Sequence, residues 1–265
     1  MDYLQGQVFE KYSSHNLDRL HGSKPEKEST KAAVKLIAPK LIEGSKILEV
    51  GCSSGHLLRS LSPKNLALRY VGIDIDRYAI NKGNEAIANL KLPGIEKAQL
   101  IEGYAEDLPF GDSEFDIVIC LNVLEHLHEP KNAIKELTRC AKKFVIIRTL
   151  VSDETYIVKE VRNNLHKKLG YDHLTLPEPE NELDEFGNPR VYIYQNVYSK
   201  DLISSILEKQ TDVKTWNIFE DNLFDQKAFD LDNEVSSLPR ITKVINGKQV
   251  RGLFIDTNYW ITVEK

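Results

Sequence analysis

The feature that most constrains the fold of this chain is residues 47–61, where a short apolar run breaks into a glycine loop. The apolar run before Gly51 predicts a strand, and leucines at helical spacing after Gly55 predict a helix. A strand, a tight loop and a helix in this order form the first unit of a Rossmann-like sheet. Such a loop lets a nucleotide-like ligand lie against bare backbone at the start of the helix.

A second apolar run, residues 70–74, follows this helix and ends in an acid, Asp74. An acid at the end of the second strand accepts hydrogen bonds from two ribose hydroxyls. The loop and this acid together predict a cofactor of the adenosine type.

The loop differs from the Gly-x-Gly-x-x-Gly fingerprint of dinucleotide binding. Ser53 stands where a glycine would let a pyrophosphate approach, and His56 stands where a small residue would favour helix packing. Glu49, just before the loop, would place negative charge near a diphosphate. The same carboxylate suits a ligand with an ammonium or a sulfonium group, and S-adenosylmethionine carries both.

Two further motifs follow in the sequence. Residues 103–110 read Gly-Tyr-Ala-Glu-Asp-Leu-Pro-Phe, and residues 115–127 form an apolar run that ends in Glu-His-Leu. With the Glu-x-Gly-x-x-x-Gly loop and the acid at position 74, these motifs have the order and spacing of a known family. The chain resembles the class I S-adenosylmethionine-dependent methyltransferase superfamily, of the small-molecule type with a Glu-His-Leu motif. The resemblance covers about residues 30–150 and is poor elsewhere.

The resemblance implies a set of cofactor-binding residues. In relatives, the acid before the glycines lies near the methionine end, the acid after the second strand binds the ribose, and the turn of the third motif covers the adenine. Carried over to this sequence, the cofactor-binding residues are Glu49, Gly51, Cys52, Ser53, Gly55, Asp74, Ile75, Ala105, Glu106 and Asn122. Two positions depart from the family, because Ser53 replaces a central glycine and Tyr104 replaces a common Asp.

Two histidines are the predicted catalytic residues. Methyl transfer requires an acceptor held in line with the leaving sulfur, and an oxygen acceptor also needs a base. His126 follows the fourth strand at the carboxyl edge, where ligands of open sheets bind, and His173 lies in a later segment that we expect above the site. The alternative for His126 is a ring that only packs beneath the pocket. Asn122 either binds the cofactor or the acceptor, or only closes the strand end by hydrogen bonding.

The run from Asn122 to His126 also bears on metal binding. Some resembling methyltransferases hold magnesium with Glu-x-x-Glu-His and a distant His. Here Asn122 replaces the first carboxylate, and a hard cation prefers several carboxylate oxygens. We therefore predict no metal, and Glu125 is alternatively a helix N-terminal acid favoured by the helix dipole.

Strands and helices alternate through the first half of the chain, which predicts a Rossmann-like, doubly wound α/β fold. The predicted sheet is mostly parallel and seven-stranded, with a closing C-terminal antiparallel hairpin. Its strands are residues 46–50, 69–74, 97–101, 115–121, 144–147, 213–219 and 252–263. Predicted helices cover residues 31–41, 55–62, 77–90 and 130–141, with Ser29 and Asp76 as N-caps of the first and third.

We expect one domain over residues 1–265. Residues 1–28 are a lid or a tail, with Tyr12, His15 and His21 as lid candidates, and residues 29–150 form the cofactor-binding core. Residues 151–265 form a substrate-recognition insert and the closing strands. Within it we expect a helix over 155–168, a loop over 170–190, a strand over 191–194, which contains Tyr192 and Tyr194, and a helix over 200–209. Substrate recognition is placed in 150–200, with 220–250 as a second contributor.

The net charge of −5 gives no reason to expect a nucleic acid as partner. No apolar run approaches the ~18 residues of a membrane span, and no secretory leader is evident, so we expect no membrane association. Three cysteines without metal spacing suggest free thiols and a cytoplasmic location.

These patterns predict methyl transfer from S-adenosylmethionine to an oxygen of a small polar metabolite, such as a sugar or a natural-product intermediate. Nitrogen is the second choice of acceptor atom. The alternatives are an RNA or protein acceptor, and a non-catalytic cofactor-binding sensor or partner subunit. The loop already disfavours a nicotinamide oxidoreductase. The sequence leaves the acceptor and the oligomeric state open.

Overall fold

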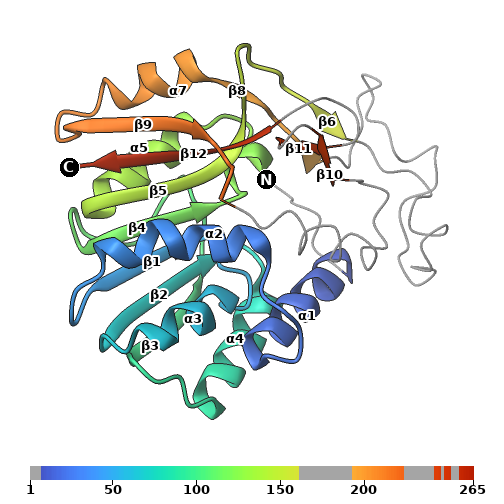
Figure 1. Ribbon diagram of the computed structural model, residues 1–265, viewed down its shortest axis with the longest axis vertical. Helices are drawn as coiled ribbons and strands as arrows, with labels where there is room; N and C mark the ends of the chain where they lie inside the picture. Colours follow the sequence, from blue (N-terminus) through green and yellow to red (C-terminus); the bar gives the residue numbers. More distant parts are fainter. Residues whose placement is uncertain (1–6, 161–192, 224–241, 246–247, 252–256) are drawn as a thin grey trace.

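A mostly parallel β-sheet forms the centre of the protein (Figure 1). The computed structural model describes residues 7–160, 193–223, 242–245, 248–251 and 257–265. The strands lie in the order β3-β2-β1-β4-β5-β12-β9, and β8 pairs with β5. The sheet strands are β1 (Lys46–Val50), β2 (Leu68–Asp74), β3 (Ile95–Glu102), β4 (Phe115–Leu121), β5 (Ala141–Ser152), β8 (Tyr198–Ser199), β9 (Thr215–Glu220) and β12 (Thr257–Glu264).

The seven predicted strands are all present, and the doubly wound α/β fold is confirmed. Strands β1 to β5 are parallel, whereas β12 runs antiparallel to both β5 and β9. The sheet differs from the prediction in two details. A short eighth strand, β8, adds to β5, and β5 is longer than the predicted 144–147 because its continuation pairs with β12 as far as Val151.

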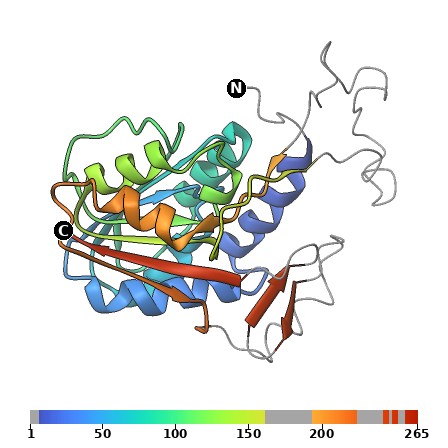
Figure 2. The same cartoon turned by 90° about the horizontal axis from the view of Figure 1, so that it is seen from above.

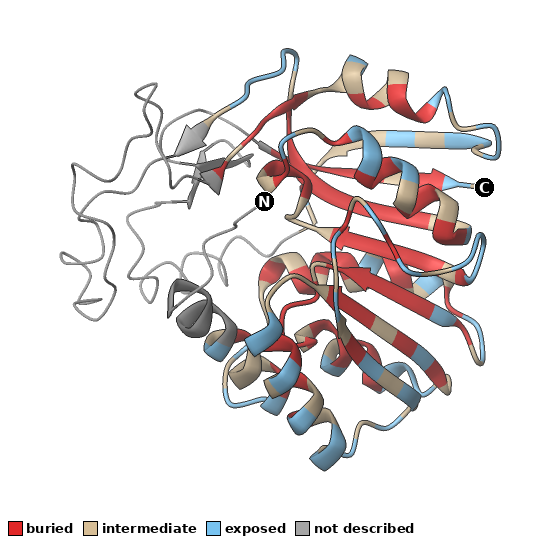
Figure 3. Cartoon of the chain, turned by 180° about the vertical axis from the view of Figure 1, so that it is seen from behind, coloured by how far each residue is buried: buried red, intermediate tan, exposed pale blue. Residues whose placement is uncertain are grey.

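Helices cover both faces of the sheet. Helices α2 (Glu28–Ile37), α3 (His56–Leu61) and α4 (Arg77–Asn89) pack their apolar residues on one face, and α5 (Lys131–Cys140) and α7 (Lys200–Leu207) on the other. Figure 2 shows α2 and α5 on opposite sides of the strands. The central strands are buried between these layers (Figure 3), which explains their nearly continuous apolar sequences. In the described part of the chain, no helix is long and apolar enough to cross a membrane.

Two residues predicted as N-caps can be compared with the observed starts of α2 and α4. The side chain of Asp76 accepts a hydrogen bond from the backbone of Ala79, which confirms it as the N-cap of α4. The prediction for Ser29 is wrong, because α2 already begins at Glu28 and Lys27 is its N-cap. An acid in the first turn favours this earlier start through the helix dipole.

Residues 7–21 form a helix, α1 (Gln7–His21), that packs against α3 and α4. Leu20 is fully buried in this packing, whereas His21 is exposed at the helix end. His15 is half-buried and contacts Lys24. The side chain of Tyr12 lies outside the described residues.

The segment after β5 is not the helix predicted for 155–168, as far as the structure describes it. Tyr156 pairs with Val197, and β6 (Lys159–Glu160) pairs antiparallel with β7 (Ile193–Tyr194). The backbone bonds therefore run to the returning chain, because pairing distant in sequence overrides a local helical pattern. Residues 161–192, which include the predicted loop and Tyr192, lie outside the described residues.

The later elements of the insert agree better with the prediction. Strand β7 retains the end of the strand predicted over 191–194, and α7 matches the helix predicted over 200–209. Between β9 and β12 the chain forms an antiparallel pair, β10 (Thr242–Ile245) and β11 (Lys248–Arg251), which overlaps the end of the predicted second contributor, residues 220–250.

Candidate functional site

The candidate site lies at the edge where the parallel strands end. β1 has β2 on one side and β4 on the other, so the strand order reverses there. Open α/β sheets bind ligands outside the carboxyl ends of the strands at such a switch point. Gly51 follows β1, Asp74 ends β2 and Asn122 follows β4, so the fold brings three predicted site residues to this edge.

The loop after β1 requires glycine at its first position. Gly51 has a φ of 78°, and a Cβ atom added there would lie 2.1 Å from Cγ2 of Val123. The N–H groups of Gly51 and Cys52 both donate to the carbonyl of Ile73, at 2.8 and 3.1 Å. These contacts press the loop against the end of β2, and the Val123 side chain packs directly against Gly51.

Ser53 departs from glycine at a position where glycine would be favoured. Its φ of 49° lies in the left-handed region, which costs a residue with a Cβ about 1–2 kcal/mol. Two hydrogen bonds hold it in place. Its N–H donates to Oδ2 of Asp74 at 2.7 Å, and its hydroxyl accepts from Nδ2 of Asn16 at 3.0 Å.

Asp74 presents a half-buried carboxylate at the end of β2. Oδ2 accepts from Ser53, and Oδ1 accepts from the N–H of Asp76 at 2.9 Å. Burial raises the pKa of Asp74 above its ordinary value, and the backbone donors oppose that rise. A carboxylate fixed in this way can accept hydrogen bonds from vicinal hydroxyls. Ile75 is half-buried beside it.

Glu49 lies on β1 with only 2% of its surface exposed. The hydroxyl of Tyr70 on β2 donates a hydrogen bond to its Oε2. Burial raises the pKa of Glu49 from 4.5 to about 8 despite this bond, and the nearby charge of Asp74 adds to the rise. Glu49 therefore carries a proton at neutral pH, and a cationic ligand group would favour its ionised form.

The neighbouring thiol is not a nucleophile. Cys52 is fully buried, and burial raises the pKa of its thiol well above the ordinary value. Because the thiolate is the reactive form, Cys52 contributes packing and backbone contacts. Gly55 has a φ of 79° and ends the loop immediately before α3.

The turn that begins the motif of residues 103–110 is hydrogen-bonded to the same edge of the sheet. The N–H of Gly103 donates to the backbone carbonyl of Asp74 at 3.0 Å. Ala105 is buried and Glu106 is half-buried. Tyr104, the second departure from the family pattern, is 53% exposed. The structure thus places Ala105 and Glu106 in a turn held directly beside β2.

His126 lies in the short 3-10 helix η3 (Leu124–His126) and is half-buried. Its Nδ1 is 2.9 Å from the carbonyl oxygen of Tyr194 and 3.1 Å from Nε2 of Gln195. A carbonyl only accepts, so Nδ1 bonds to Tyr194 when it carries the ring proton, whereas the Gln195 amide nitrogen only donates and bonds to an unprotonated Nδ1. In the tautomer that donates to Tyr194, Nε2 is the basic nitrogen of the neutral ring.

Asn196 fixes the returning insert to the turn that carries His126, and the sequence did not single it out. It is fully buried, its N–H donates to the carbonyl of Glu125, and its Nδ2 donates to that of Leu127, both at 2.7 Å. The signal available in the sequence was the pair of amides, Gln195 and Asn196, between apolar and aromatic residues.

Asn122 and Glu125 are held by neighbouring side chains. Oδ1 of Asn122 accepts a hydrogen bond from Arg148, and Arg148 also pairs with Asp221 at 2.8 Å. This arrangement agrees with strand-end hydrogen bonding by the Asn122 oxygen. Glu125 is fully buried, and its Oε2 accepts from the hydroxyl of Thr149 at 3.0 Å. Among the described residues, no group of three His, Cys, Asp or Glu side chains is arranged to hold a metal ion.

The second predicted catalytic histidine, His173, and the neighbour of His126 at position 128 differ in what the structure describes. His173 lies outside the described residues. His128 is exposed, and its ring packs edge-on against Tyr194 with 5.6 Å between the centroids.

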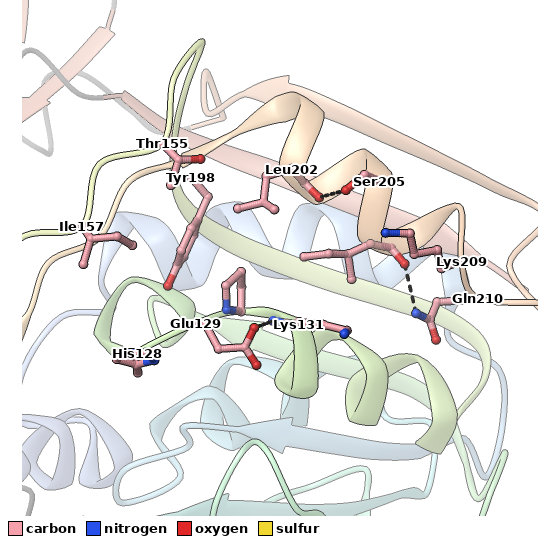
Figure 4. Close-up of a pocket in the computed structure, with 12 residues that line it drawn as sticks. His128, Glu129, Lys131, Thr155, Ile157, Tyr198, Leu202, Ser205, Lys209 and Gln210 are labelled. Carbon is pink, nitrogen blue, oxygen red and sulfur yellow. Dashed lines mark hydrogen bonds between the residues drawn. The ribbon is translucent and has the colours of Figure 1, made fainter.

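A cavity of about 310 Å³ opens between α5 and α7 (Figure 4). It is lined by side chains that include His128, Lys131, Tyr198, Leu202 and Lys209. None of the predicted cofactor residues lines this cavity, so it is separate from the glycine loop.

Asn16 on α1 contacts the glycine loop, and the sequence did not reveal this contact. It is 1% exposed and touches the loop through Ser53. Its Oδ1 has no hydrogen-bond partner among the described residues. Asn16 lies one helical turn before Leu20, at a position where an amphipathic helix would carry an apolar residue. A polar residue at this position was the signal in the sequence.

Comparisons with known proteins agree with this arrangement. Residues 48–147 match the profile of a family described as a methyltransferase domain. The U6 snRNA methylphosphate capping enzyme Amus of Drosophila melanogaster is 33% identical over 100 residues, which are 34% of this chain and 33% of that protein. The ubiquinone biosynthesis O-methyltransferase of Pseudomonas fluorescens is 27% identical over 150 residues, 54% of this chain and 60% of that protein.

A solved structure shows that the likeness extends to the fold. A SAM-dependent methyltransferase from Methanosarcina mazei superposes with a TM-score of 0.52 at 20% identity, covering 87% of this chain and 96% of that one. The chain spans about a third to three fifths of the length of the curated relatives that it matches.

Proposed function

We propose that this chain, which belongs to the class I S-adenosylmethionine-dependent methyltransferase superfamily, methylates an oxygen of a small polar metabolite. The protein is a methyltransferase, and its cofactor is S-adenosylmethionine. The cofactor supplies a methyl group on a positively charged sulfur, which makes the methyl group reactive toward a nucleophile. The acceptor and the roles of the site residues are the proposal.

The site residues fit such a cofactor. The carboxylate of Asp74 offers two acceptor oxygens for ribose hydroxyls. The buried carboxyl of Glu49 suits a cationic group, since only a positive neighbour would offset the cost of ionising it there. The turn containing Ala105 and Glu106 is held beside β2, where an adenine would follow the ribose.

The observation that carries the choice of oxygen is the orientation of His126. The Tyr194 carbonyl contacts Nδ1 and holds the ring at the carboxyl edge of the sheet, and in the tautomer that donates to this carbonyl the basic nitrogen is Nε2. A hydroxyl acceptor must lose a proton as it attacks, and an imidazole ring can take that proton as a general base. The likeness to an O-methyltransferase supports the same choice of acceptor atom.

A screen of acceptors tests the proposal. The protein would be incubated with S-adenosylmethionine carrying a radiolabelled methyl group and with matched pairs of small molecules, one bearing a hydroxyl and the other an amine. We expect label on hydroxylated sugars or natural-product intermediates. Transfer to amines alone would contradict the choice of oxygen.

An RNA acceptor is the second candidate. The chain is more identical to the capping enzyme Amus than to the ubiquinone biosynthesis O-methyltransferase, although the matched segment is shorter. The net charge of −5 weighs against it. An RNA substrate would bind with an affinity that falls steeply with salt, whereas a small neutral acceptor would show little salt dependence.

The proposal includes a cytoplasmic location. The support is that Cys52, Cys120 and Cys140 are all buried and unpaired, as expected for a protein of a reducing compartment.

A further inference from the structure

We infer that Asn16 binds the amino-acid part of the cofactor, with its carboxamide oxygen accepting a hydrogen bond from the ammonium group. The inference deepens the proposed function and rests on it. It assigns a ligand contact to α1, a helix outside the part of the chain that carries the family motifs.

The placement of α1 brings Asn16 to the glycine loop. The helix packs against α3 and α4, the two helices that follow β1 and β2, and Figure 1 shows it along this flank of the sheet. Asn16 is 1% exposed, and its Nδ2 donates to the hydroxyl of Ser53 at 3.0 Å. Ser53 in turn donates its N–H to Asp74. One loop residue therefore joins Asn16 to the carboxylate proposed to bind the ribose.

The carboxamide oxygen of Asn16 is the atom that points to a ligand. Its Oδ1 is buried and has no hydrogen-bond partner among the described residues. A buried acceptor without a donor is destabilising, and such atoms are rare in folded proteins. The hydroxyl oxygen of Ser54, in the same loop, is also buried without a partner there. Polar atoms left in this state at the edge of a binding loop are explained by a bound group that supplies the donors.

The neighbouring residues favour the ammonium group of the cofactor as the donor to the Asn16 oxygen. A carboxamide oxygen only accepts, so its partner must be a donor. The buried carboxyl of Glu49, two residues before the loop, also favours a cation. The donors of the cofactor are its ribose hydroxyls, its adenine amine and its ammonium group. Asp74 already provides acceptors for the ribose, and the adenine turn is fastened to the end of β2.

Calorimetric titration of the full chain with two ligands tests the inference. S-adenosylhomocysteine contains the amino-acid part, whereas 5′-methylthioadenosine keeps the adenosine thioether and lacks it. For Asn16→Leu, which removes the amide at similar size, we expect the affinity for S-adenosylhomocysteine to fall at least about tenfold. The affinity for 5′-methylthioadenosine should stay within about twofold of the wild type. Ser14→Ala, an exposed change on the same helix, is the control and should alter neither.

Asn16→Asp separates the oxygen from the amide nitrogen. A carboxylate keeps the acceptor, so this variant should bind S-adenosylhomocysteine within a few-fold of the wild type. A large loss in this variant would mean that the nitrogen faces the ligand carboxylate, and it would overturn the inference. If Asn16→Leu does not fold, Asn16→Ala takes its place in the comparison of ligands.

The remaining outcomes are distinct. Equal loss of both ligands in Asn16→Leu would show that Asn16 only docks α1 or meets the ribose, which overturns the inference. Unchanged binding of both would also overturn it. Failure of the folded wild type to bind S-adenosylhomocysteine would instead contradict the proposed function itself.

Discussion

The backbone N–H of Ser53 donates a hydrogen bond of 2.7 Å to the carboxylate of Asp74. This bond joins the glycine loop after β1 to the acid that ends β2, and it holds Ser53 in a left-handed conformation. Asp74 therefore has two tasks in the proposed site. It offers acceptors to the ribose, and it fixes the loop against which the cofactor lies.

Substitution of Asp74 tests both tasks. We expect Asp74→Ala to weaken binding of S-adenosylhomocysteine by about 10- to 100-fold, because a hydrogen bond to a charged group contributes about 1.5–3 kcal/mol. Calorimetry gives the affinity. Glu102→Ala is the matched control, since Glu102 ends the neighbouring strand β3 and pairs with Arg77 at the surface. An affinity for Asp74→Ala within threefold of the wild type would contradict the assignment.

The buried carboxyl of Glu49 predicts a pH dependence of stability. The pKa of Glu49 is about 8 in the folded protein and near 4.5 when exposed, so between these values the folded state holds more protons than the unfolded state. The free energy of unfolding then falls as the pH rises through this interval, by up to about 1.4 kcal/mol per pH unit from this group. Tyr70, Asp74 and Lys27 face Glu49 and contribute to its pKa.

Glu49→Gln removes the titration and isolates this contribution. Urea unfolding at several pH values from about 5 to about 8 should show the variant gaining stability relative to the wild type as the pH rises. Parallel curves for the two proteins would show that Glu49 does not titrate in this range.

Cofactor binding should release a proton from Glu49. At about pH 7 the carboxyl is protonated in the empty protein, and a cationic group beside it would favour ionisation. Calorimetry in buffers of different ionisation enthalpy measures the number of protons released. We expect the wild type to release close to one proton more than Glu49→Gln on binding S-adenosylhomocysteine. Equal release by the two proteins would place the cation away from Glu49.

The buried ion pair of Arg148 and Asp221 predicts an effect on the stability of the fold. Both side chains are at most 6% exposed, and Arg148 also holds the Asn122 oxygen. Arg148→Met should lower the free energy of unfolding by about 3–5 kcal/mol, because it leaves Asp221 buried without its partner. Arg69→Met breaks an exposed pair with Glu96 and should leave the denaturation midpoint unchanged. A loss of equal size in both variants would mean that the buried pair has no special role.

His126→Asn tests the proposed base. Removing a general base typically lowers kcat by about 100- to 10,000-fold, and affinity for S-adenosylhomocysteine should not change. His128→Asn is the matched control, because His128 is exposed two residues away and faces the cavity between α5 and α7. A fall in affinity with unchanged kcat would make His126 a binding residue instead.

The parts of the fold set by local sequence were predictable. The strand, loop and helix around Gly51 and the cap at Asp76 depend on neighbours within a few residues, and the structure has them as expected. The helix predicted over 155–168 was wrong in its described part because Tyr156 pairs with Val197, far along the chain. Local spacing carries no information about such a partner.

The missed site residues have the same explanation. Asn16 contacts Ser53, which is 37 residues away in the sequence, and Asn196 is hydrogen-bonded to the turn that follows β4. Sequence patterns located the acids at positions 49 and 74, since these stand inside motifs. They could not locate an amide brought to the loop by the packing of another helix.

The central claim is that the edge between β1, β2 and β4 binds S-adenosylmethionine, and calorimetric titration of the wild-type chain tests it most directly. Parallel titrations would use S-adenosylhomocysteine and NAD at the same concentrations. The site described above predicts saturable binding of S-adenosylhomocysteine and no binding of NAD, because Ser53 stands where a glycine would let a pyrophosphate approach. Binding of NAD alone, or of neither ligand by protein shown to be folded, would contradict it.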